Sequence, residues 1–249
     1  MEAEMVFSDI HTHALFGVDD GAKTEKEMLA LVKAAYDGGT RLICLTPHFH
    51  PGYYGDNRAK VKEAYEMLKS FVNEELPDLK LCLGNELRYS PDCISWLRDG
   101  ECSTMNGTRN VLVDFSSEEE ERVIVRALDQ MLNAGYRPIL AHVERYSSLK
   151  RSREVLARFK DNGVLMQINS QALTGEWGLT LKNRCARLLA EGLVDLVCSD
   201  CHDMKDRRPG LSAAHAAIAK RYENGYADAL CSRNAAQIVN VFTNGKETD

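Results

Sequence analysis

Short apolar runs rich in valine, isoleucine and leucine recur along the 249-residue chain, and stretches in which apolar residues return with helical period separate them. Because the apolar runs are near-continuous rather than alternating, they are typical of strands that are buried on both faces. They predict seven strands, at residues 5–11, 41–46, 80–86, 110–115, 138–142, 164–169 and 195–199.

The stretches between the strands predict amphipathic helices. The clearest helix begins at Thr24, whose T-x-x-E pattern with Glu27 is a capping box, and it ends at the pair Gly38-Gly39, a helix stop signal. The remaining helices are predicted at residues 58–73, 119–134, 152–162, 181–191, 211–222 and 234–242.

The alternation of strand and helix predicts the α/β class, with a parallel sheet joined by right-handed crossovers. Seven such units favour an irregular seven-stranded (β/α) barrel, similar to a TIM barrel, and an open parallel sheet is the alternative. The chain contains no linker, low-complexity run or internal repeat, so we expect residues 1–249 to form a single domain.

Composition narrows the class of protein further. A hydrophobic content of 44% suffices for one sizeable core, and a formal net charge of −6 without a long run of Lys or Arg disfavours nucleic-acid binding. No apolar segment approaches the roughly 18 residues of a membrane helix, and Met1 to Phe7 is too short for a signal peptide. We therefore expect a cytoplasmic protein without membrane insertion, whose eight cysteines are reduced.

The positions of the histidines suggest chemistry. Six of the seven fall at or just after a predicted strand end, and the exception, His215, falls in a predicted helix. The first strand ends in D-I-H-T-H, and residues i and i+2 of a strand point to the same side. His11 and His13 can therefore face one ion, at the end of the strands where barrels build their sites.

Carboxylates occupy the same kind of position. An Asp-Asp-Gly sequence follows the first histidine pair, and six of the seven predicted strands end in a side chain that can bind metal. The candidate metal ligands are His11, His13, Asp20, His48, Glu86, Asp114, His142, Asp200 and His202.

Histidine nitrogens and carboxylate oxygens suit manganese, iron, zinc or cobalt, whereas magnesium prefers more oxygen. This many ligands exceeds what one ion takes, so two or three ions are implied, and Glu86, from a central strand, is the natural bridge. Four carboxylates and three divalent ions leave a positive site, which favours a phosphate dianion. Arg145, three residues after His142, and the pair Arg207-Arg208 are candidate phosphate ligands.

These segments resemble a known family. The motifs D-I-H-T-H, V-D-D-G, T-P-H, G-N-E-L, V-D-F-S, A-H-V-E-R-Y and C-S-D-C-H are similar, in order from Asp9 to about Val241, to those of the polymerase and histidinol phosphatase (PHP) superfamily. V-D-D-G and A-H-V-E-R-Y resemble its bacterial manganese-dependent tyrosine-protein phosphatases, which act on tyrosine autokinases of capsule and exopolysaccharide synthesis.

The resemblance implies a PHP fold, a phosphotyrosine protein as substrate and three divalent ions, manganese first, with iron, cobalt, zinc or magnesium as alternatives. It implies Arg145 and Arg208 as catalytic phosphate contacts. It implies that the first ion is bound by His11, His13, Glu86 and Asp200. The second ion shares Glu86 and adds Asp114 and His142. The third ion is bound by Asp20, His48 and His202.

Three departures from the family pattern occur. The position of Asp114 is more often Glu in relatives. The loop after His48 reads F-H-P-G-Y-Y where relatives tend to carry Arg, which makes His50 a further candidate for substrate binding. The stretch after His202 is one residue longer, which leaves the choice between Arg207 and Arg208 open.

The expected reaction is in-line attack by a metal-activated hydroxide, without a phospho-enzyme. The alternatives are a small-molecule phosphatase such as a histidinol phosphatase, a nuclease, and a non-catalytic protein that binds a tyrosine kinase. Cys201 to Arg207 also spells the C-x5-R spacing of cysteine-dependent phosphatases. That loop has no Gly, and Asp203 and Asp206 would repel a phosphate.

Overall fold

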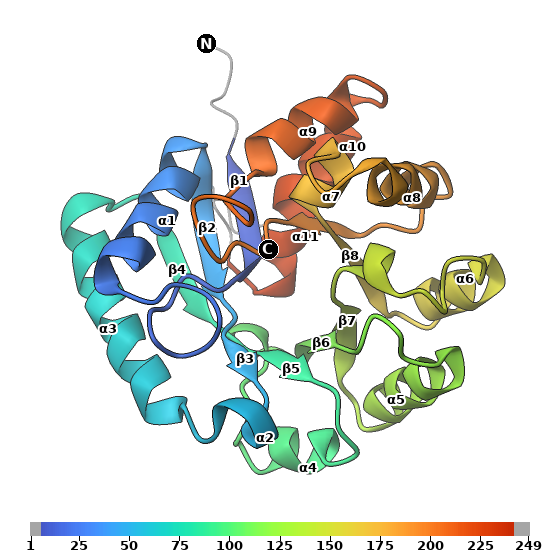
Figure 1. Ribbon diagram of the computed structural model, residues 1–249, viewed down its shortest axis with the longest axis horizontal. Helices are drawn as coiled ribbons and strands as arrows, with labels where there is room; N and C mark the ends of the chain where they lie inside the picture. Colours follow the sequence, from blue (N-terminus) through green and yellow to red (C-terminus); the bar gives the residue numbers. More distant parts are fainter. Residues whose placement is uncertain (1–5, 242–249) are drawn as a thin grey trace, which may run out of the picture.

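The computed structural model describes residues 6–241. Its strands lie at the centre and its helices outside them (Figure 1), and every strand pairing is parallel. The predicted α/β class with a parallel sheet is confirmed. The strands are β1 (Phe7–Thr12), β2 (Thr40–Leu45), β3 (His48–Phe49), β4 (Lys80–Leu83), β5 (Glu86–Arg88), β6 (Asn110–Asp114), β7 (Arg137–Leu140), β8 (Leu165–Asn169) and β9 (Leu196–Cys198).

The predicted count of seven strands is not confirmed. Residues 6–241 form nine strands, in the sheets β1-β2-β4 and β3-β5-β6-β7-β8-β9. One break follows β2 at Pro47, which has no N–H to donate. The other separates β4 from β5 at Gly84, where a Cβ atom would lie 2.9 Å from the Met105 sulfur. Met5, the predicted start of the first strand, lies outside the described residues.

The chain after β9 returns to β1. Asp200 N donates to His11 O and His13 N donates to Cys201 O, both at 2.9 Å, and Thr12 forms a parallel bridge with Cys201. The first and last segments that carry candidate ligands are therefore held side by side by backbone hydrogen bonds.

Thr24 caps α1, because its hydroxyl accepts a hydrogen bond from Glu27 N at 3.2 Å. The Glu27 carboxylate accepts from Lys23 N at 2.6 Å, so the second bond of the predicted capping box falls one residue earlier. The other predicted long helices are present with shifted ends; Phe242, at the predicted end of the last one, lies outside the described residues. Four short helices, α2, α4, α7 and α10, were not predicted. The helices are α1 (Glu25–Asp37), α2 (Pro51–Tyr54), α3 (Arg58–Glu75), α4 (Cys93–Arg98), α5 (Glu121–Asn133), α6 (Arg153–Asp161), α7 (Ser170–Thr174), α8 (Leu179–Ala190), α9 (Leu211–Ala219), α10 (Asn224–Asp228) and α11 (Asn234–Ile238).

The core fills the space between the strands and the helices around them. All eight cysteines are buried and free, and they pack as small apolar side chains. Within residues 6–241, no helix combines the length and apolar character that crossing a membrane requires.

Candidate metal centre

The candidate ligands converge where the strands end. His11 lies on β1, His48 on β3, Glu86 on β5 and Asp114 on β6. His142 follows β7, and Asp200 and His202 follow β9. Two of them have left-handed backbone, His142 with φ 34° and Asp200 with φ 54°. This conformation is unfavourable for residues other than glycine and is concentrated at functional sites.

Among residues 6–241, three groups of candidate ligand atoms lie within 4.8 Å of one another. Glu86 and His13 each belong to two groups, so the side chains form one connected cluster. The sets match those that the resemblance implies, with His13 added to the third. They are His11, His13, Glu86 and Asp200; Glu86, Asp114 and His142; and His13, Asp20, His48 and His202.

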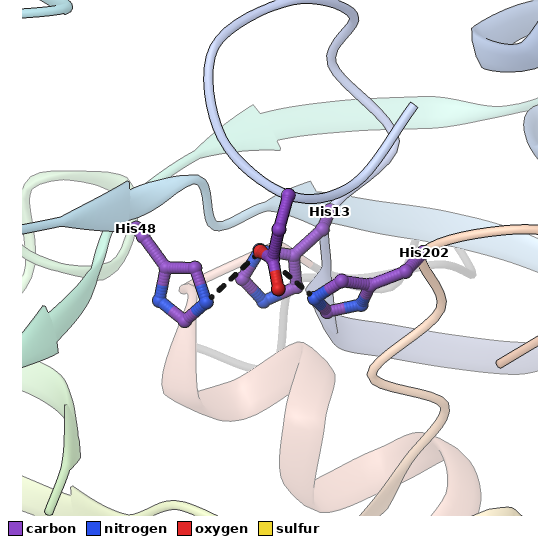
Figure 2. Close-up of side chains that lie close together, drawn as sticks. His13, His48 and His202 are labelled. Carbon is purple, nitrogen blue, oxygen red and sulfur yellow. Dashed lines mark ion pairs between the residues drawn. The ribbon is translucent and has the colours of Figure 1, made fainter. Parts of the chain in front are cut away.

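The third group surrounds a single carboxylate. The rings of His13, His48 and His202 converge in Figure 2, where dashed lines mark ion pairs. Nε2 of His48 and Nε2 of His202 each lie 3.3 Å from Asp20 Oδ1. Three elements far apart in the sequence thus bring nitrogen and oxygen ligands to one point.

Glu86 is the centre of the whole cluster and is only 1% exposed. Its two carboxylate oxygens lie 3.0–3.3 Å from ring nitrogens of four histidines, which are His11, His13, His48 and His142. A carboxylate surrounded in this way has the geometry expected of a bridge between ions.

Several buried atoms of the cluster have no partner with good hydrogen-bond geometry, although most of them lie 3.1–3.3 Å from an oppositely charged side chain. They include Nε2 of His11, His13 and His202, Nδ1 of His142 and Oδ1 of Asp200. Burying polar atoms without partners costs free energy, roughly 1–3 kcal/mol each. Because these ligand atoms crowd around a common centre without good hydrogen-bond geometry, the residues fit a bound metal better than a self-contained polar network.

A ring of outer side chains orients the ligands. His13 Nδ1 lies 2.8 Å from Asp19 Oδ2, and His11 Nδ1 lies 3.1 Å from Gln167 Oε1. Asn169 Nδ2 donates to Asp200 Oδ2 at 2.8 Å. Partners of this kind leave Nε2 of each ring free for a metal. Gln167 and Asn169 were not predicted, although two polar residues spaced i, i+2 in an otherwise apolar strand were a usable signal.

Gly21 fixes the loop that carries Asp19 and Asp20. A Cβ atom at this position would lie 1.9 Å from the carbonyl oxygen of His13. Only glycine allows the loop to pack this closely against the end of β1, which explains the glycine of the V-D-D-G motif.

The carboxylates make the cluster favourable for positive charge. Burial lowers the pKa of His11, but the negative charges of Glu86 and Asp200 outweigh burial and raise it to about 9. The pKa of His13 also reaches about 9, because Asp19 and then Glu86 overcome the effect of burial. Burial raises the pKa of Asp200, but the charges of His11 and Arg207 hold it below its usual range.

These shifts predict a pH dependence for metal binding. With pKa values of about 9, His11 and His13 are protonated at neutral pH when no metal is bound. Because a metal binds only neutral imidazole, binding must displace these protons, and affinity should rise as pH increases toward about 9. We expect Mn²⁺ affinity to increase by up to about tenfold per pH unit for each proton displaced. Calorimetry in buffers of different ionisation enthalpy measures this release, and an affinity that does not change with pH would contradict it.

A cavity of about 330 Å³ opens beside the cluster. Three guanidinium groups, from Arg88, Arg145 and Arg207, line it together with candidate metal ligands. Nη1 of Arg145 lies 3.7 Å from Asp200 Oδ2. Arginine side chains around a hollow next to metal ligands suit a phosphate group.

The predicted phosphate contact Arg208 lies away from the cavity. Arg208 is half-exposed, pairs with Glu176 at 2.8 Å and does not line the cavity. Arg207 lines it instead, with Nη2 2.5 Å from Asp200 Oδ2. Arg207 O also accepts hydrogen bonds from His202 N at 2.7 Å and from Asp203 N at 3.2 Å, so the loop closes on itself before Arg208.

His50 lies near the cluster, since burial and then the charges of Arg88 and His48 lower its pKa. It precedes α2, its ring stacks on Tyr53 at 5.8 Å, and it neither joins a ligand group nor lines the cavity. The predicted substrate contact of His50 therefore stays a prediction.

The C-x5-R spacing does not form a cysteine-dependent site. Cys201 is only 2% exposed, and burial raises the pKa of its thiol to about 12. A thiol in this state is not an effective nucleophile near neutral pH.

The chain is similar in sequence to proteins of a known family. Residues 7–240 match the family described as "Capsular polysaccharide synthesis, CpsB/CapC". The tyrosine-protein phosphatase CpsB of Streptococcus pneumoniae is 33% identical over 236 residues, which cover 93% of this chain and 97% of that protein. The tyrosine-protein phosphatase YwqE of Bacillus subtilis is 32% identical over 200 residues, covering 80% and 78%.

Solved structures agree with the sequence relatives. A structure from work on YwqE of Bacillus subtilis and CpsB of Streptococcus pneumoniae, described there as unique metal-dependent tyrosine phosphatases, superposes with a TM-score of 0.86. It is 28% identical, and the match covers 96% of each chain. An inactive dihydroorotase-like domain of Chaetomium thermophilum, 10% identical with a TM-score of 0.56 over 96% of this chain and 80% of that one, shares the fold alone.

Proposed function

The chain belongs to the CpsB/CapC family, and on this basis we propose that it is a metal-dependent tyrosine-protein phosphatase. The observation that carries the proposal is the joint occurrence of a connected histidine–carboxylate cluster and an arginine-lined cavity beside it. A cluster of this kind serves hydrolysis, and the cavity supplies cations for a phosphate dianion.

We propose that the cluster holds three divalent ions, with Glu86 as the shared ligand. Manganese is the first candidate, and iron, cobalt, zinc and magnesium are the others, because the donors are imidazole nitrogens and carboxylate oxygens. Nε2 of His11, His13 and His202, each of which faces a carboxylate without good hydrogen-bond geometry, supports this assignment.

Bound divalent ions supply Lewis-acid chemistry and make a hydroxide available near neutral pH. The protein's own contribution is orientation and charge. Arg145 and Arg207 bind the equatorial oxygens of the phosphate, and Asp200 holds both guanidinium groups at the edge of the cavity. Phenolate, with a pKa near 10, leaves more readily than an alkoxide and needs less proton donation.

We further propose that the substrate protein is a bacterial tyrosine autokinase that controls capsule or exopolysaccharide synthesis. The family description, capsular polysaccharide synthesis, supports this choice. A small-molecule phosphatase such as a histidinol phosphatase is the alternative, since the same cluster and cavity suit any phosphomonoester.

Relative rates on three substrates test the proposed function. With Mn²⁺ present, we expect kcat/KM for a phosphotyrosine peptide to exceed that for a matched phosphoserine peptide and for histidinol phosphate by at least about tenfold, because phenolate is the better leaving group. A preference for histidinol phosphate would instead indicate a small-molecule phosphatase. Metal-loaded protein that is inert on all three would favour a non-catalytic kinase-binding protein.

A further inference from the structure

Arg88 lies next to the candidate ligands, and neither the motifs nor the relatives' names give it a role. It ends β5, two residues after Glu86, so both side chains point to the same side of the strand. In the parallel pairing of β5 with β6, Arg88 is the Cα partner of Asp114. An arginine and a candidate metal ligand therefore face each other across neighbouring strands.

The two oxygens of Asp114 have different partners. Oδ2 accepts a hydrogen bond from Arg88 Nη1 at 2.6 Å. Oδ1 lies 3.6 Å from His142 Nε2, and the hydroxyl of Tyr146 donates to it at 3.5 Å. One oxygen is thus held by the arginine, while the other faces the group formed with Glu86 and His142.

The guanidinium group of Arg88 is itself held in place. Nη1 also donates to the carbonyl oxygen of Phe115 at 2.9 Å. The hydroxyl of Tyr146, on the other side of Asp114, accepts a hydrogen bond from Phe115 N at 3.3 Å. Both partners of Asp114 are therefore tied to the same backbone segment, and this fixes the carboxylate from two directions.

We propose that Arg88 is a positioning residue for the divalent ion bound by Glu86, Asp114 and His142. This proposal rests on the proposed metal centre. By holding Oδ2, Arg88 keeps Oδ1 of Asp114 directed at the ion. Outer partners of metal ligands typically change metal affinity by about 10–100-fold.

A cation so near a metal site also has an opposing effect, because it repels the incoming ion. Here the charge of Arg88 is paired with Asp114, and a third of its side chain (33%) is exposed to solvent. Solvent screens the repulsion strongly, whereas the orientation of a short, largely buried carboxylate depends directly on its partners. Loss of Arg88 should therefore weaken metal binding rather than strengthen it.

The test is a titration of metal-stripped protein with Mn²⁺, in which electron paramagnetic resonance measures the concentration of the free ion. In Arg88→Gln we expect one class of sites to weaken by about 10–100-fold and the others to keep wild-type affinity. Arg88→Lys should retain part of the affinity, and it decides the question if Arg88→Gln does not fold. The control is Arg98→Gln on α4, an exposed arginine that pairs with Asp99 at 2.9 Å and should leave every class unchanged.

A double-mutant cycle separates positioning from a general structural effect. If Arg88 acts through Asp114, Arg88→Gln should change Mn²⁺ binding little in the Asp114→Asn background. Unchanged Mn²⁺ affinity in Arg88→Gln, with or without a higher KM, would overturn the proposal; a higher KM would indicate direct contact with the phosphate. A wild-type protein that binds no Mn²⁺ would overturn the metal centre itself.

Discussion

Replacing Glu86 with Gln is expected to lower kcat/KM on a phosphotyrosine peptide by about 10³-fold. Metal ions contribute several kcal/mol to transition-state stabilisation, and each 1.4 kcal/mol is about a factor of ten in rate. Glu86 belongs to two of the three ligand groups, and its oxygens lie 3.0–3.3 Å from four imidazole nitrogens. The amide keeps the shape of the side chain but loses the charge that a bridge between cations requires.

The same variant should bind fewer Mn²⁺ ions, which plasma mass spectrometry of dialysed protein measures. The matched control is Glu74→Gln on α3, an exposed position that should keep both activity and metal content. Glu86→Gln protein with wild-type metal content and near-wild-type activity would show that this carboxylate does not bridge ions.

The second large effect distinguishes two neighbouring arginines. Arg207→Ala should reduce kcat/KM by about 10²-fold, because removing one preorganised donor from a developing charge typically costs 10²–10³-fold. In Arg208→Ala, kcat/KM should stay within about twofold of wild type. Arg208 forms only an exposed ion pair with Glu176, and such pairs contribute little to stability. Steady-state kinetics on one phosphotyrosine peptide compares both variants.

Arg207→Lys refines this comparison. Lysine keeps the charge but lacks the planar fork that binds phosphate through two nitrogens, so it should recover only part of the lost rate. If Arg208→Ala were the impaired variant and Arg207→Ala were active, Arg208 and not Arg207 would be the arginine that contacts the phosphate.

Much of the site could be predicted from the sequence because the carboxyl ends of parallel strands all lie at the same edge of the sheet. His11, His48, Glu86 and Asp114 were located by this rule alone. The α/β class followed from the alternation of short apolar runs with stretches of helical period. These features depend on short stretches of sequence, and this is why they were visible.

What the sequence did not reveal depends on contacts between distant segments. Arg207 and Arg208 are adjacent in the sequence, and no spacing rule contains their different partners, Asp200 and Glu176. The break at Gly84 follows from the approach of Met105, which lies in another part of the chain. Gln167 contacts His11, which lies 156 positions away in the sequence, so a local pattern can mark Gln167 as unusual but cannot identify its partner.

The central claim is that bound metal carries out phosphotyrosine hydrolysis in this cluster. The most direct measurement is the rate of phosphotyrosine-peptide hydrolysis by protein that has been stripped of metal and then titrated with Mn²⁺. We expect no measurable hydrolysis with chelator present, and recovery that saturates near the number of ligand groups, three. Undiminished hydrolysis by fully stripped protein would contradict the account.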